Sequence, residues 1–181
     1  MRLFIAVLFD KESFETIWQA EEMLRLQAVA GNFTRKENLH MTLAFLGETT
    51  NAEGAKRAMN AVEAEPFPLT LHGAGMFSHG DNDIYWLAVE HEPRLIALQN
   101  RLCKVLREEG FVLEDRTFQP HVTLGKRVRV KEDFVMQDYI NAIPPISARV
   151  DKISLMKSEW VHGVLTYTEI GVKKLGLVQG E

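Results

Sequence analysis

The sequence predicts a fold of two pseudo-symmetric lobes, each a small sheet with helices on its outer face. The order strand, helix, His-x-Thr strand, helix, strand occurs once before about residue 80 and once after it. His121 follows His40 by 81 residues, and the preceding strands, near Leu3 and Ile84, keep the same offset. We therefore expect a single domain over residues 1–181, with an internal pseudo-repeat of about 1–80 and 82–181.

The elements of the first half follow from hydrophobic spacing and composition. Aliphatic and aromatic runs predict strands, and the apolar residues between Phe14 and Val29 recur near helical spacing. An Ala-rich amphipathic segment predicts a second helix. The predicted elements are a strand Leu3–Phe9, a helix Lys11–Ala30, a strand Leu39–Leu46, a helix Thr50–Glu63 and a strand Phe67–Met76.

The second half follows the same logic. Its long helix has leucine and valine residues on one stripe, Pro93 in the first turn and Gly110 as the C-terminal cap. The predicted elements are a strand Ile84–Glu90, a helix Pro93–Glu109, a strand His121–Gly125, a helix Glu132–Ile140, and strands Ala148–Met156 and Leu165–Lys173.

Composition argues against a disulfide-dependent fold and against a membrane-spanning protein. Hydrophobic residues make up 46% and charged residues 25% of the chain, so a core can form without disulfides. The single cysteine, Cys103, lies beside an apolar helix stripe and is expected to be a core thiol. The apolar run Leu3–Phe9 is too short to span a membrane. We expect a cytoplasmic monomer with no membrane partner.

Two segments with the pattern His-x-Thr-Leu carry the candidate chemistry: NLHMTLAFLG and QPHVTLGKR. Residues two apart in a strand share a face, so His40 lies beside Thr42 and His121 beside Thr123. The intervening apolar residues point to the opposite face. Each segment therefore predicts a sheet with a buried side and a polar side that forms the wall of a cleft.

This pattern suits phosphoryl chemistry. The imidazole pKa is about 6.5, so one histidine can take a proton from water while the other gives one to a leaving oxygen. The hydroxyls of Thr42 and Thr123 can donate to phosphate oxygens. Two histidines are too few ligands for a catalytic metal ion, and neither motif contains a carboxylate. We expect no metal and no cofactor.

Other residues near the motifs can be interpreted in two ways. The net charge of −4 excludes a wholly basic surface, but local basic residues either bind an RNA backbone or form a solvated face. Aromatic residues near the cleft either stack on a base or pack in the core. The basic residues are Arg35, Lys36, Arg116, Lys126, Arg127, Arg129 and Lys131; the aromatic ones are Phe45, Phe77, Phe118 and Trp160. His72, His79, His91 and His162 are expected in loops or on the surface.

The chain resembles the 2H phosphoesterase superfamily, and within it the bacterial and archaeal RNA 2′,3′-cyclic phosphodiesterases, historically called 2′-5′ RNA ligases. The resemblance covers nearly the whole chain, through both histidine segments, RLFIAVLF, DRTFQPHVTLGKR and LMKSE. It implies a bilobal α+β fold with antiparallel sheets around a central cleft. It also implies hydrolysis of a terminal 2′,3′-cyclic phosphate of RNA to a 2′-phosphate, with ATP-independent 2′-5′ ligation as a side activity.

By the same resemblance, His40 is the proton donor to the leaving oxygen, His121 the base that activates water, and Thr42 and Thr123 the phosphate ligands. The chain departs from the family at Lys126, where arginine is usual, and Arg127 follows it. Lysine gives a point charge and arginine a bidentate fork. Either residue is a candidate phosphate ligand, and in a regular strand Arg127 shares the face of His121.

Two alternatives remain open at this point. A 2H enzyme can act on a small cyclic nucleotide phosphate, such as ADP-ribose 1″,2″-cyclic phosphate, with the same residues. A non-catalytic module that binds RNA ends is the alternative from another class. The presence of both histidines and both threonines argues against the second.

Overall fold

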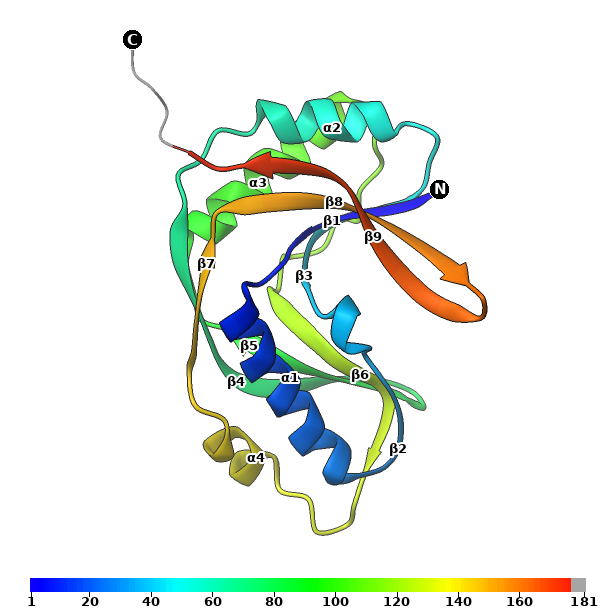
Figure 1. Ribbon diagram of the computed structural model, residues 1–181, viewed down its shortest axis with the longest axis vertical. Helices are drawn as coiled ribbons and strands as arrows, with labels where there is room; N and C mark the ends of the chain where they lie inside the picture. Colours follow the sequence, from blue (N-terminus) through cyan, green and yellow to red (C-terminus); the bar gives the residue numbers. More distant parts are fainter. Residues whose placement is uncertain (177–181) are drawn as a thin grey trace.

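The computed structural model describes residues 1–176 and contains nine strands, four α-helices and one short 3-10 helix in that range (Figure 1). The strands are β1 (Arg2–Val7), β2 (Ala28–Phe33), β3 (Met41–Glu48), β4 (Phe67–His79), β5 (Asn82–Val89), β6 (His121–Val130), β7 (Ile146–Val150), β8 (Lys152–Val161) and β9 (Val164–Lys174). The helices are α1 (Lys11–Leu26), η1 (Lys36–Asn38), α2 (Ala52–Ala61), α3 (Pro93–Glu108) and α4 (Met136–Ala142).

All nine strands belong to one curled antiparallel sheet with the order β7-β4-β5-β6-β3-β1-β8-β9, and β2 pairs with β6 beside this path. The two sheets expected from the sequence are thus the halves of one continuous sheet. They meet where β3 and β6 share a single register pair, Met41 with Val122. The α+β class with antiparallel strands is confirmed, and the internal pseudo-repeat stays a prediction.

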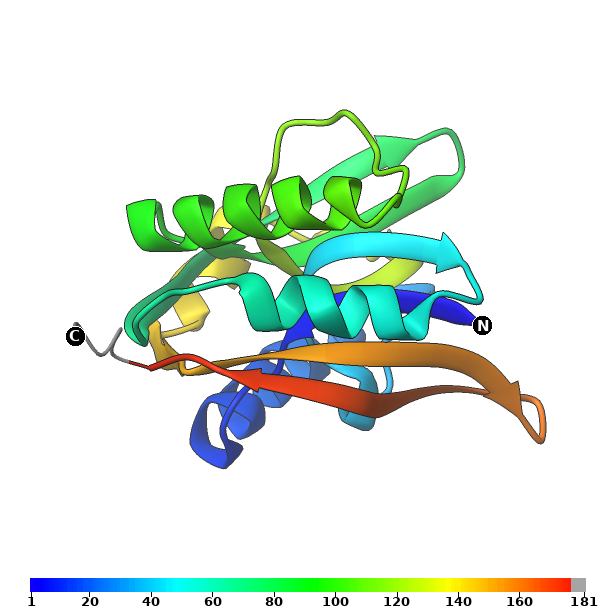
Figure 2. The same cartoon turned by 90° about the horizontal axis from the view of Figure 1, so that it is seen from above.

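The helices lie on the outer side of this curled sheet (Figures 1 and 2). Helices α2 and α3 pack together on the half that contains β3, β8 and β9, whereas α1 and α4 pack on the half that contains β4 and β7. Each half of the sheet therefore carries helices from both halves of the sequence. No helix in residues 1–176 is long and apolar enough to cross a membrane.

The core lies between the helices and the outer face of the sheet. The predicted stripe of α3 is fully buried at Leu95, Leu98, Leu102 and Leu106. Pro93 begins this helix, and Gly110 follows its end in the left-handed region at φ 91°, as the sequence predicted. On the other side of the molecule, Ile17 and Leu24 of α1 are equally buried.

Two predicted elements are wrong in ways that affect the site. The first helix ends at Leu26 rather than Ala30, and Ala28–Phe33 forms β2 along β6. Ala28 and Ala30 favour helix, but Gly31 does not, and hydrogen bonds to β6 hold the segment extended. The predicted strand Ala148–Met156 is interrupted at Asp151, so that β7 pairs with β4 at one edge while β8 pairs with β1.

Candidate active site

The two His-x-Thr segments meet at the junction of the two halves of the sheet. His40 immediately precedes β3, and His121 begins β6. Because the strands run antiparallel through the pair Met41–Val122, His40 lies across from Thr123 and Thr42 across from His121. The alternating residues are buried, with Met41 and Val122 both at 0% exposure, as the strand pattern predicted. Both histidines therefore face the inner side of the sheet.

The two imidazoles are held in the same way. His40 Nδ1 lies 2.7 Å from the Asn38 carbonyl oxygen, and His121 Nδ1 lies 2.6 Å from the Gln119 carbonyl oxygen. A carbonyl only accepts hydrogen bonds, so each ring carries a proton on Nδ1. In the neutral ring, Nε2 is then a proton acceptor, and in the charged ring it is a donor. The carbonyls two residues before each histidine thus select the nitrogen available for chemistry.

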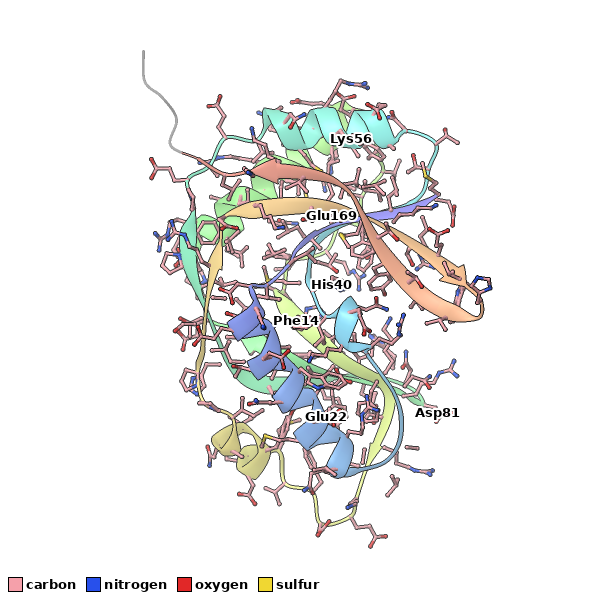
Figure 3. All side chains as sticks on the ribbon, in the orientation of Figure 1. Phe14, Glu22, His40, Lys56, Asp81 and Glu169 are labelled. Carbon is pink, nitrogen blue, oxygen red and sulfur yellow. The ribbon has the colours of Figure 1, made fainter. Side chains whose placement is uncertain are left out.

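His40 has a second contact and a shifted pKa. Its Nε2 lies 2.9 Å from Thr42 Oγ1, which donates to the neutral ring. Burial lowers the pKa of His40 below its usual 6.5, the charges of His121 and Lys126 lower it further, and the bond to the Asn38 carbonyl opposes them. Without bound ligand, His40 is accordingly neutral at pH 7. Figure 3 places it near the middle of the molecule.

Aromatic rings flank both histidines. Phe4 and Tyr167 contact the His40 ring at centroid distances of 4.9 and 5.3 Å. Phe77 lies edge-on to His121 at 5.3 Å, with Trp86 at 6.0 Å. Of these rings, sequence reasoning singled out only Phe77. The others come from strands whose partners were unknown, so their alternation patterns gave no sign of which face they would share.

Lys126 and Arg127 do not occupy alternate positions of a regular strand. A register shift in the β5–β6 ladder leaves Leu124 and Gly125 both buried, and Lys126 after them is exposed. The positive charge of Lys126 is close enough to His40 to lower the pKa of its imidazole. Arg127 adopts a left-handed conformation with φ 53°, and its backbone N–H donates to Asn82 Oδ1 at 3.1 Å. The strand is therefore irregular here, and the condition under which Arg127 was expected to share the face of His121 is not met.

A cavity of about 350 Å³ adjoins the histidine site. Thr42 and His121 line one side of it. Its other walls include the predicted Phe45, Phe77, Phe118 and Arg116, together with His79 and the Gln99–Cys103 pair. Cys103 is buried, at 8% exposure, as expected for a core thiol. His79, which was expected in a loop or on the surface, is exposed at the end of β4 and lines this cavity.

The remaining predicted residues lie away from the cavity. Trp160 is 72% exposed near the tip of the β8–β9 hairpin. Lys36 pairs with Glu15 at 2.7 Å, and Arg35 donates to the Leu165 carbonyl at 3.1 Å. Within residues 1–176, no group of three His, Cys, Asp or Glu side chains is arranged to hold a metal ion.

Comparisons with known proteins agree on one family. The family model described as the 2′-5′ RNA ligase superfamily matches residues 14–160. The RNA 2′,3′-cyclic phosphodiesterase of Thermotoga maritima is 33% identical over 87% of each chain. The Escherichia coli protein of the same name is 32% identical over 98% of this chain and 97% of its own.

Solved structures give the same result. E. coli LigT in apo form superposes with a TM-score of 0.78 at 28% identity, covering 97% of this chain and 98% of that chain. LigT complexed with 3′-AMP gives a TM-score of 0.77 at 28% identity, covering 96% of each. The similarity therefore spans the fold as well as the sequence.

Proposed function

The chain belongs to the 2′-5′ RNA ligase superfamily, and from this we propose that it hydrolyses a terminal 2′,3′-cyclic phosphate of RNA to a 2′-phosphate. The relatives in T. maritima and E. coli that are named RNA 2′,3′-cyclic phosphodiesterase support this reaction. The observation that carries the proposal is the junction of β3 and β6. There, a single register pair sets one His–Thr pair across from another.

We assign the roles as the family resemblance implies them. His121 Nε2 accepts a proton from water, whose oxygen forms a bond to phosphorus. The bond between phosphorus and O3′ breaks, and His40 Nε2 gives its proton to O3′. The product is a 2′-phosphomonoester with a free 3′ hydroxyl, and proton exchange with solvent restores both rings. Such acid–base assistance is worth about 10²–10⁴-fold in rate.

The phosphate group determines the charge of His40 in this scheme. The ligand-free protein holds His40 neutral, whereas a proton donor must be charged. A bound phosphate anion beside the ring favours the charged form and raises its pKa. Substrate binding therefore lets His40 take up from solvent the proton that is later delivered to O3′. Thr42, Thr123 and Lys126 hold the non-bridging oxygens, with the hydroxyls as donors and the lysine as a charge.

The same site can join RNA ends. A 5′ hydroxyl of a second RNA in place of water attacks the cyclic phosphate, with His121 as base and His40 as acid. The same P–O3′ bond breaks, and a 2′-5′ linkage forms. No ATP is consumed, because the cyclic diester is exchanged for another diester. We propose this ligation as a side activity, since water competes for the same position.

Product analysis on an RNA that ends in a 2′,3′-cyclic phosphate tests the proposal. We expect a 2′-phosphate and a free 3′ hydroxyl, formed equally well with EDTA present. A 3′-phosphate product contradicts the assigned bond cleavage, and loss of activity in EDTA that zinc or manganese restores contradicts metal-free chemistry. Turnover restricted to small cyclic phosphates, such as ADP-ribose 1″,2″-cyclic phosphate, removes RNA as the substrate. Binding without any turnover identifies a module for RNA ends.

A further inference from the structure

We propose that the β8–β9 hairpin is a binding arm for the single-stranded RNA that lies 5′ of the reacting phosphate. Trp160 stacks on a base of that strand, and Arg2 contacts its backbone. The inference rests on the proposed function and specifies how the site favours an RNA chain over a mononucleotide.

The hairpin projects beyond the rest of the sheet in both views (Figures 1 and 2). Its tip exposes three large apolar side chains: Trp160 at 72%, Val161 at 39% and Val164 at 40%. Contiguous exposed apolar residues of this kind mark binding surfaces on soluble proteins. An exposed tryptophan offers a flat ring to a planar partner, and every nucleobase has such a face.

The exposed tip is continuous with the histidine site. Residues paired across antiparallel strands share a face of the sheet. Ser158 pairs with both Arg2 and Tyr167, and two residues further along the hairpin Trp160 pairs with Leu165. Since Tyr167 lies edge-on to His40 at 5.3 Å, one row of side chains leads from the catalytic candidate to the tip.

The tip of the hairpin is tied to the segment that precedes His40. The Leu165 carbonyl accepts from Asn38 Nδ2 at 2.9 Å and from Arg35 Nη1 at 3.1 Å. Asn38 is the same residue whose carbonyl orients the His40 ring. One residue thus links the arm to the imidazole, so a strand laid along the arm has a defined path to the site.

The charge along this row suits a polyanion. Within residues 1–176, Arg2 makes no ion pair with a carboxylate. Its cross-strand neighbour Glu48 pairs instead with the Met1 amino group at 3.4 Å. Arg2 lies close enough to Tyr167 to lower its pKa, although burial raises that pKa more. An unpaired guanidinium beside the row is available to a phosphate.

The length of the row identifies the occupant as a chain. Tyr167 lies 5.3 Å from His40, and Leu165, the cross-strand partner of Trp160, follows two residues or about 7 Å along the strand, so the row is at most about 12 Å long. At the 3.4 Å spacing of a stacked strand this corresponds to about three or four nucleotides. A mononucleotide held at the histidines cannot reach Trp160. Aromatic rings with flanking cations are the usual surface for single-stranded nucleic acid, which favours RNA over a protein partner.

Kinetics on two substrates tests the role of Trp160. The variants are Trp160→Ala, Trp160→Phe and, as an exposed apolar control on α1, Leu26→Ala. On an oligoribonucleotide ending in a 2′,3′-cyclic phosphate, we expect Trp160→Ala to raise KM by about 5- to 100-fold, and Trp160→Phe to retain most of the affinity. On a nucleoside 2′,3′-cyclic phosphate, all three variants match the parent. Equal losses on both substrates, or no loss on the oligonucleotide, overturns the proposal.

Salt dependence tests Arg2. Each phosphate contact to a single strand contributes about 0.7 to the slope of log K against log salt concentration. We expect Arg2→Gln to reduce the slope for oligonucleotide binding by about that amount. Arg149→Gln, an exposed arginine on β7, serves as the matched control and leaves the slope unchanged. Equal slopes for Arg2→Gln and the parent contradict the contact.

Binding to an RNA that ends in a 2′-phosphate separates this inference from the proposed function. Fluorescence anisotropy measures the binding of this RNA to the hairpin even if no cyclic phosphate is hydrolysed. Weaker RNA binding by Trp160→Ala supports the role of the hairpin in RNA binding, whether or not the protein hydrolyses the cyclic phosphate. If Trp160→Ala alters only self-association, measured by light scattering, then the hairpin is a contact between copies of the chain and the RNA proposal is wrong.

Discussion

Met41 and Val122 face each other as the one register pair between β3 and β6, and both side chains are fully buried. The two candidate histidines are the residues next to this pair, His40 just before β3 and His121 at the start of β6. Their separation is therefore controlled by packing on the far side of the sheet, where no substrate reaches. The pair couples the hydrophobic core to the geometry of the candidate site.

Truncating Met41 tests that coupling. We expect Met41→Ala to lower the free energy of unfolding by about 2–5 kcal/mol, because a buried cavity remains. It also lowers kcat at temperatures where the variant is folded, since the strands at the junction shift. Leu98→Ala on α3 is the matched control, fully buried but remote from the junction. Urea unfolding and kcat are measured for both, and an equal loss of kcat in the control contradicts a specific role.

Removal of either imidazole is the direct test of the acid–base scheme. We expect His40→Ala and His121→Ala to lower kcat by about 10²–10⁴-fold on an RNA cyclic phosphate. His72→Ala is the control, because His72 lies on β4 near Glu90. Unchanged turnover in either site variant refutes the scheme, provided that circular dichroism shows the variant to be folded.

The hydroxyls of the two motifs have their own test. Thr42→Val and Thr123→Val keep the shape of the side chain but remove the donor to phosphate. A hydrogen bond to a charged group is worth about 1.5–3 kcal/mol, so kcat/KM falls by about 10- to 150-fold. Thr→Ser at the same positions keeps the hydroxyl and retains most of the activity. If Val and Ser variants behave alike, the hydroxyls do not bind the reacting group.

The pH profile of kcat/KM reports the pKa values of the free protein. Since burial and two positive charges lower the pKa of His40, the assigned proton donor, we expect a bell-shaped profile in which the limb that reports deprotonation of His40 lies below 6.5. Lys126→Gln removes one of these charges, so the limb moves upward toward 6.5, and KM for the anionic substrate rises. Arg129→Gln, an exposed residue on the same strand, is the control. A limb unmoved by Lys126→Gln shows that this lysine does not act on His40.

A buried carboxyl outside the site predicts a pH dependence of stability. Glu21 is fully buried on α1 with Oε2 unbonded, and burial raises its pKa to about 7 from 4.5 despite the nearby Arg25. A raised pKa means that the folded state binds the proton more tightly than the unfolded state. The stabilisation is present below 4.5 and is lost as the pH rises through about 7.

Glu21→Gln removes this dependence. We expect its free energy of unfolding to fall less than that of the parent between pH 5 and pH 8, measured by urea unfolding at several pH values. Glu22→Gln is the control on the same helix, with its side chain half exposed. Parallel curves for Glu21→Gln and the parent contradict a neutral buried carboxyl.

Much of the site follows from strand alternation alone. The period of two that a strand imposes is enough to predict that the histidine and threonine of each motif share one face and that the residue between them is buried. This holds for His40 and Thr42 and for His121 and Thr123. The relation across the junction could not be predicted in that way. It depends on which strands pair and in which register, and these are set by tertiary packing.

Other errors have local physical causes. The sequence placed Arg127 on the face of His121 only for a regular strand, and a register shift at Leu124 and Gly125 breaks that regularity. Gly125 lies in that segment, and a glycine inside a strand often marks a bulge, so the sequence did contain a signal of this irregularity. Strand β2 was missed because Ala28 and Ala30 favour helix, and only pairing with β6 makes them extended. The helices were predicted best, because their apolar stripes repeat over several turns.

The place of β1 in the sheet has a consequence for how the protein folds. This strand lies between β3 and β8, and Phe4 pairs with Met156. Contacts between residues so far apart in sequence carry a large loop-closure entropy and slow the folding reaction. During synthesis, β1 and β3 leave the ribosome long before β8, so the half-sheet around His40 stays open at one edge until late. The candidate site around His40 is therefore complete only after β8 has been translated.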